Sequence, residues 1–150
     1  MIPESKLIRS ELTIRELALP EEVILARKSL VRWLALSLGL IMPNESRKLL
    51  LDILEVIFEL HVEKESPTTR DIIAKLESNT KEKQNPKAVY YHLQRLTKLG
   101  VLSRKKGRYL LGDGETRNLK EIFKGFYLKK VDGAFVNIAT ALDKLENNYR

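Results

Sequence analysis

The sequence predicts a mainly α chain with one small β-hairpin. Apolar residues recur at steps of three and four in several segments, which is the spacing of one face of an α-helix. Prolines and cap-type residues stand where these stripes begin, and glycines stand where several of them end. Residues 101–112 differ, because they carry two short β-prone runs around a Lys-Lys-Gly turn.

The first expected helix covers residues 20–42. Pro20 suits the first helical position, and the two glutamates after it complement the positive end of the helix dipole. From Leu30 onward the pattern is apolar almost all round, so this helix needs cover on more than one side. Gly39 and Pro43 mark its end.

A second helix is expected over residues 45–62, opened by Pro43-Asn44. Asn44 is a good N-cap residue, and an apolar stripe follows it. We expect a solvated acidic face on this helix, formed by Glu55, Glu59 and Glu63.

A third, short helix is expected over residues 68–77. Ser66-Pro67 breaks the chain before it, and Thr68 and Asp71 have the spacing of a capping box. The polar stretch 78–84 is expected to be a loop.

The fourth helix is expected over residues 85–99, with Asn85 as its cap and Gly100 as its left-handed end. Val89, Leu93 and Leu96 fall on one side and predict its buried stripe. The predicted hairpin follows, and Gly107 supplies the positive φ of its turn.

The last expected helix covers residues 117–149, with Thr116 as a candidate N-cap. Its apolar residues recur at steps of three and four up to Tyr149. We expect Gly125 and Gly133 to bend or divide it.

The basic charge is concentrated in one region. The chain has 27 Lys and Arg against 20 Asp and Glu, a net charge of +7. Residues 66–112 alone carry 11 basic and 3 acidic side chains, so they account for the whole excess. Such a concentration is typical of a surface that binds a polyanion, although a solvated lysine-rich face leaves the same pattern.

The order of the middle elements resembles the winged helix-turn-helix family. The segment TTRDIIAKLE (68–77) is similar to the family's middle helix, and AVYYHLQRLTKLGVLSRKKGRYLL (88–111) to its recognition helix and wing. Residues 89–102 are similar to the recognition-helix ends of MarR-like and ArsR-like regulators, and residues 20–41 resemble archaeal winged-helix proteins. One departure is the loop of seven or more residues after the middle helix, which exceeds the turn of the compact motif.

The resemblance implies a winged helix-turn-helix core with additional N- and C-terminal helices. It divides the chain into an N-terminal helical extension (1–43), a winged-helix domain (44–112) and a C-terminal helical segment (113–150). The implied function is a sequence-specific, double-stranded DNA-binding transcriptional regulator in the cytoplasm. The alternative is a winged-helix module that binds protein or RNA within a larger assembly.

The candidate DNA contacts lie on the recognition helix (85–99) and the wing (101–112). Arg95 and Gln94 match guanine and adenine edges in the major groove, whereas basic side chains at the helix ends and hairpin suit phosphates. For Tyr90, at the edge of the buried stripe, packing is favoured over contact with DNA, whereas for Tyr91 contact is favoured. The candidates are Lys87, Tyr90, Tyr91, Gln94, Arg95, Lys98, Arg104, Lys105, Lys106 and Arg108.

Apolar helices on both sides of the basic region predict a homodimer. Residues 20–42 and 117–149 carry more apolar surface than a three-helix core covers, so we expect them to pack across a two-fold axis. Two recognition helices would then lie about 34 Å apart, one turn of DNA. The opposing expectation is that both segments fold onto their own chain.

Little in the sequence points to catalysis, a cofactor or a metal site. There is no cysteine, which excludes disulfides, thiolate zinc sites and a cysteine nucleophile. The two histidines, His61 and His92, are expected to be structural. No glycine-rich phosphate loop, nucleophile elbow, signal peptide or bilayer-length apolar run is present. We therefore expect a non-enzymatic protein without membrane contact.

Overall fold

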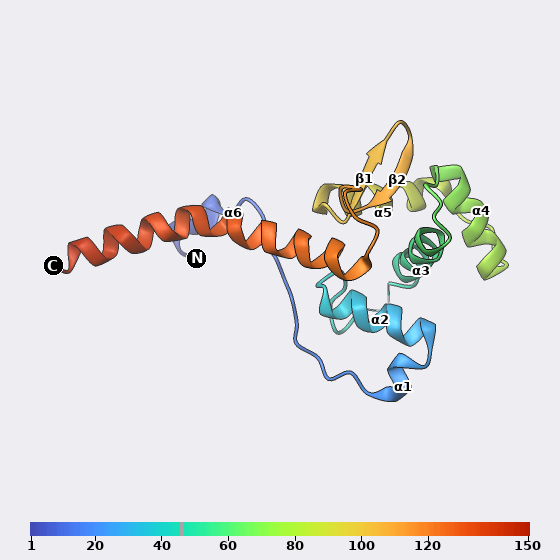
Figure 1. The fold of residues 1–150 in the computed structure, drawn as a ribbon, viewed down its shortest axis with the longest axis horizontal. Helices are drawn as coiled ribbons and strands as arrows, with labels where there is room; N and C mark the ends of the chain where they lie inside the picture. Colours follow the sequence, from blue (N-terminus) through green and yellow to red (C-terminus); the bar gives the residue numbers. More distant parts are fainter. Residues whose placement is uncertain (46) are drawn as a thin grey trace. The chain divides into compact units, whose positions relative to one another are not determined.

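The computed structural model describes residues 1–45 and 47–150. The fold is mainly helical with one two-stranded antiparallel hairpin (Figure 1). The chain forms two compact units, 1–55 and 56–150, and one helix spans the boundary between them. The domain divisions expected after residues 43 and 112 remain predictions. The elements are α1 (Glu21–Ile24), α2 (Arg27–Ser37), α3 (Lys48–Val62), α4 (Thr69–Thr80), α5 (Pro86–Leu99), β1 (Leu102–Lys105), β2 (Arg108–Leu111) and α6 (Leu119–Asn148), after a 3₁₀ helix at Pro3–Leu7.

The single helix predicted over 20–42 is wrong. The chain forms α1 and α2 instead, with Ala26 extended between them at φ −117°. The preceding segment returns along α2, where the Trp33 indole donates to the Ala18 carbonyl at 2.7 Å. A straight helix would carry residues 21–25 away from that segment, so tertiary contact overrides the local helical pattern.

Arg15 closes the C-terminal end of α2. Its Nη1 donates to the carbonyls of Leu36 and Ile41 at 2.7 and 3.0 Å, and its backbone N–H donates to Ser37. The helix therefore ends on a cation, which suits both the unpaired carbonyls and the negative end of the dipole. Gly39 follows at φ +72°, and a Cβ there would lie 2.6 Å from the Thr13 carbonyl oxygen.

The helix expected from Asn44 begins later, at Lys48. Asn44 lies in a turn and caps no helix. A Glu45 carboxylate oxygen accepts from the Met42 N–H, and the other accepts from Arg47. Such local side-chain bonds compete with helical backbone bonds. Ser46, inside the predicted helix, lies outside the described residues.

Unit 56–150 contains α4, whose start is as predicted. The Thr68 hydroxyl accepts from the Asp71 N–H, and the Asp71 carboxylate accepts from the Thr68 N–H, so the capping box is complete. The bond from the Thr68 backbone N–H to the carboxylate, and after it the interaction of the carboxylate with the Thr68 side chain, lower the pKa of Asp71, since they favour its ionised form.

The loop after α4 is shorter than predicted, because the helix continues to Thr80. Lys81 ends it in the left-handed conformation at φ 61°, which leaves residues 81–85 as the connection. The Gln84 N–H donates to the Glu77 carboxylate at 2.8 Å, and the Gln84 amide donates to the Thr80 hydroxyl. The connection to α5 is thus held by side chains of α4, a contact that its polar composition does not indicate.

The expected solvated acidic face on α3 is also wrong in part. Lys75 of α4 lies between Glu59 and Glu63, with its Nζ 3.4 and 3.7 Å from their carboxylates. Asn79 donates to Glu59 at 3.1 Å. The acidic face of α3 therefore contacts α4 through side chains that are adjacent only in the folded unit.

The C-terminal helix α6 is one continuous helix of 30 residues (Figure 1). Its N-cap is Asn118, which accepts from the Glu121 N–H, and not Thr116. Thr116 instead donates to the Glu121 carboxylate. Gly125 and Gly133 do not divide the helix, because glycine lowers helix propensity by about 1 kcal/mol but keeps the backbone N–H that proline lacks.

Candidate nucleic-acid interface

Helix α5 has the predicted caps and the predicted buried stripe. The Asn85 side chain accepts from the Lys87 N–H, and Gly100 ends the helix at φ 90°. A Cβ at Gly100 would lie 2.7 Å from the ring of Phe126, so the end of α5 packs directly against α6. The stripe residues Val89, Leu93 and Leu96 are 0–2 % exposed.

The opposite face of α5 carries its predicted contact residues. Tyr90 and Tyr91 are 39 % and 57 % exposed, and Arg95 is half-buried. Because these residues alternate with the buried stripe at helical spacing, burial of that stripe directs them outward. The exposed candidates on α5 are Lys87, Tyr90, Tyr91, Gln94 and Lys98.

The predicted hairpin forms, although Val101 lies outside β1. The register pairs Arg104 with Tyr109 and Lys105 with Arg108, which leaves a two-residue loop. Both loop residues, Lys106 and Gly107, have positive φ (52° and 78°), as a type I′ turn requires. Asparagine is favoured at the first of these positions. A lysine there lowers the stability of the turn, because the left-handed conformation is unfavourable for its backbone.

Arg104 connects the hairpin to α5. Its guanidinium carbon lies 5.9 Å from the centre of the Tyr90 ring and 5.0 Å from that of Tyr109. Both distances are within the range of cation–π attraction. Arg104 and Tyr90, which were predicted separately as contact residues, are therefore neighbours. Tyr90 packs against Arg104 and also remains partly exposed to solvent.

The four hairpin cations differ in how they are held. Arg108 donates to the Ser66 carbonyl at 2.8 Å, beside a backbone bond from Tyr109 to Pro67, so it ties the hairpin to the segment before α4. Lys105 donates to the Asp113 carbonyl at 3.1 Å. Within the described residues, no hydrogen bond or ion pair involves the side chain of Lys106, at the tip of the turn.

Sequence reasoning did not assign three further exposed cations of this unit. Arg70 lies in the first turn of α4, and Lys81 and Lys83 lie in the connection to α5. Exposed basic side chains are the groups that bind phosphate oxygens, so these positions suit phosphate contacts. The basic excess of residues 66–112 was the available signal, but a charge count does not rank individual side chains.

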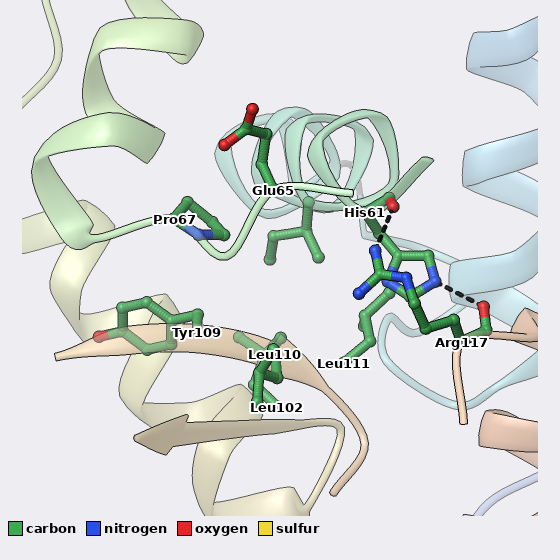
Figure 2. Close-up of a pocket in the computed structure, with 9 residues that line it drawn as sticks. His61, Glu65, Pro67, Leu102, Tyr109, Leu110, Leu111 and Arg117 are labelled. Atoms are coloured by element: carbon green, nitrogen blue, oxygen red, sulfur yellow. Dashed lines mark hydrogen bonds between the residues drawn. The ribbon is translucent and has the colours of Figure 1, made fainter. Parts of the chain in front are cut away.

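A small pocket lies behind the hairpin (Figure 2). Its walls come from α3, from Glu65 and Pro67, from both strands and from Arg117, and its volume is about 20 Å³. One water molecule fills such a space, whereas small-molecule sites need several hundred cubic ångströms. Across it His61 Nε2 bonds to the Arg117 carbonyl, and Arg117 donates to the His61 carbonyl, both at 2.8 Å. His61 thus links α3 to the start of α6.

The described residues, 1–45 and 47–150, contain neither a metal-binding cluster nor a membrane-spanning helix. No group of three or more histidines and carboxylates there is arranged to hold a metal ion. No helix in that part of the chain has both the length and the apolar character to cross a bilayer.

Comparison of the chain with protein-family models, with curated proteins and with solved structures found no match. The function of the chain is therefore inferred from the local chemistry of α5 and the hairpin.

Proposed function

We propose that this protein is a sequence-specific, double-stranded DNA-binding transcriptional regulator with a winged helix-turn-helix core. In this proposal α3, α4 and α5 are the three helices, α5 is the recognition helix, and β1 and β2 form the wing. A helix of this kind fits the major groove, and a basic hairpin reaches the adjacent backbone or minor groove.

One observation carries the proposal: in the described part of the chain, no salt bridge neutralises the cations of α5 and the hairpin. Among the described residues, no salt bridge involves Lys87, Arg95, Lys98 or any of the four hairpin cations. Lys75 of α4, by contrast, lies between two glutamates. Positive charges that no salt bridge neutralises, on exposed elements joined through Arg104 and Tyr90, are what a polyanion-binding surface requires.

The proposal assigns different roles to two kinds of residue. Arg95 and Gln94 read base edges, because guanidinium and carboxamide groups match guanine and adenine in the major groove. Lys106 at the wing tip and Lys98 near the end of α5 neutralise phosphates, which adds affinity without sequence preference.

Selection of bound duplexes from a random pool tests the proposal. A reproducible motif is the expected result, and the selected duplex then serves in titrations at increasing salt. We expect the logarithm of affinity to fall linearly with the logarithm of salt concentration, with a slope near −0.9 for each phosphate contact. A pool that yields no motif would refute sequence-specific regulation and favour the alternative of a winged-helix module for protein or RNA.

Two substitutions separate the proposed roles. Arg95→Ala should cost about 1–3 kcal/mol on the selected duplex and relax specificity at one base pair. Lys106→Ala should weaken all duplexes about equally and reduce the salt slope by about one unit. Lys144→Ala, which removes an exposed charge from α6, is the matched control and should change neither quantity. Equal behaviour of Arg95→Ala and Lys106→Ala would show that α5 does not read bases.

A further inference from the structure

The C-terminal part of α6 carries an apolar stripe that is exposed to solvent. Every residue from Leu128 to Arg150 is exposed. Seven apolar residues in this part repeat at alternating steps of three and four, the a and d positions of a heptad. They are 42–83 % exposed, and they are Leu128, Val131, Phe135, Ile138, Leu142, Leu145 and Tyr149. We call these seven residues the seam.

The residues around the seam match a helix that packs against another helix. Ala134, Ala139 and Ala141 flank it and let a second helix approach closely. Gly133, Thr140 and Asn147 fall at the f positions, farthest from the seam, and charged residues occupy most of the remaining places. The glycine that lowers helix propensity is therefore on the face that a partner would not touch.

The exposed area is sufficient for a stable interface. With about 200 Å² for a fully exposed side chain of this size, the exposed fractions of the seam amount to roughly 700–800 Å². A standard-size interface buries about 800 Å² on each partner. A solvated stripe of this area is uncommon on a soluble monomer. A helix of this length with two glycines also needs tertiary packing to remain stable.

We propose that the seam binds the seam of a second copy of this chain, in an antiparallel coiled coil. The antiparallel alignment pairs Leu128 with Leu145, Val131 with Leu142, and Phe135 with Ile138, so all of these layers are apolar. Lys124, four residues before Leu128, then lies beside the partner's Tyr149. The aliphatic part of the lysine packs on the tyrosine ring, and its charge is attracted to the face of the ring. The sequence predicts a dimer interface formed by residues 20–42 and 117–149. The coiled coil uses only the second of these segments.

A parallel alignment fits the charges less well. It would place Glu121 opposite Glu121 and Lys124 opposite Lys124, because these two residues continue the heptad toward the packed part of α6. Like charges at facing positions are repulsive. The same alignment would put two Phe135 rings into one layer, whereas the antiparallel alignment sets each ring against an isoleucine.

The antiparallel alignment also sets a distance. Its centre falls between residues 136 and 137, about 12 residues from the middle of the packed segment of α6, which runs from Ile122 to Tyr127. At 1.5 Å per residue the middles of the two packed segments lie about 36 Å apart along the coil. That distance matches two half-sites one DNA turn apart. This last step rests on the proposed function, whereas the coiled coil itself does not.

Sedimentation equilibrium of the full chain tests the association. We expect a dimer at micromolar concentration, and Ile138→Lys should raise its dissociation constant at least about 100-fold, because it places a charge in the seam. Val136→Lys is the matched control: Val136 is 67 % exposed but lies off the seam, so this variant should remain dimeric. A monomeric wild-type chain, or equal effects of the two lysines, would overturn the proposal.

Cysteine cross-linking tests the orientation, since the natural chain has no cysteine. In an antiparallel coil, an oxidised mixture of Val131→Cys and Leu142→Cys chains gives mixed disulfide dimers, and neither variant alone cross-links. In a parallel coil each variant cross-links with itself, which would overturn the antiparallel assignment. If the dimer forms but selection yields no DNA motif, only the proposed function fails.

Discussion

Helices α5 and α6 carry the same kind of apolar stripe, but the stripe of α5 is buried and that of the C-terminal part of α6 is exposed. In α5 the stripe residue Leu93 is 0 % exposed, whereas Leu142 in the C-terminal part of α6 is 55 % exposed. Both leucines recur at helical spacing with apolar neighbours. The comparison teaches that periodicity identifies a face to be covered but does not say what covers it.

The two halves of α6 show the same difference within one helix. Ile122 and Tyr127 are buried, and Phe123 lies 6.1 Å from the Phe58 ring of α3. From Leu128 onward the helix is exposed. The change occurs at one residue step, so Tyr127 marks the limit of the packed part.

The largest expected effect comes from truncating one leucine in each stripe. Leu93→Ala should lower the free energy of unfolding by about 2–5 kcal/mol, since it leaves a cavity among buried side chains. Leu142→Ala should change it by less than about 0.5 kcal/mol in chains kept monomeric by dilution. Urea unfolding at low protein concentration measures both. Equal losses would mean that the α6 stripe is covered within its own chain.

Alkaline pH offers a second way to locate the limit of the packed part. Burial raises the pKa of Tyr127 from 10.0 to about 12. The unfolded chain therefore loses this proton first, so the stabilising contribution is complete below pH 10 and is lost as pH rises toward about 12.

Thermal unfolding across this pH range should separate two tyrosine variants. Tyr127→Phe should show a smaller alkaline loss of stability than the wild type. Tyr149→Phe, at an 83 % exposed position, should follow the wild type. If Tyr127→Phe lost stability at alkaline pH as the wild type does, the packed part of α6 would not end at Tyr127.

The smallest expected effect is at the hairpin turn, where the exposed side chain of Lys106 is proposed to contact DNA and not another protein chain. Lys106→Asn should raise stability by a few tenths of a kcal/mol, because asparagine adopts the left-handed conformation more readily. It should also weaken DNA binding as much as Lys106→Ala does, since both remove the charge. Calorimetry and duplex titration measure the two effects. A stability gain without loss of binding would remove Lys106 from the proposed interface.

Local signals predicted α4, α5 and the hairpin well. The Thr68–Asp71 capping box, the Asn85 cap and the Gly100 end each involve residues within a few positions of one another. The cap of α6 was missed by two residues, because Thr116 and Asn118 are both good cap residues. Between them lies Arg117, which exchanges two hydrogen bonds with His61 of α3, a contact that cap preferences do not contain.

Contacts between distant residues could not be predicted. The break between α1 and α2 follows from a segment that returns along α2, and Arg15 closes a helix more than 20 residues away. The stacking of Arg104 on Tyr90 joins two elements whose candidates were assigned separately. Each of these depends on how elements meet in space, which periodicity and capping patterns do not contain.

From its sequence alone, this protein is a chain of amphipathic helices with one cationic hairpin, because caps, turn residues and apolar spacing act over a few residues. The folded unit alone decided which apolar faces are buried, which lysines are paired with carboxylates, and where α6 leaves its packed surroundings. Burial and ion pairing depend on the three-dimensional neighbours of a side chain, and residues far apart in the sequence supply those neighbours.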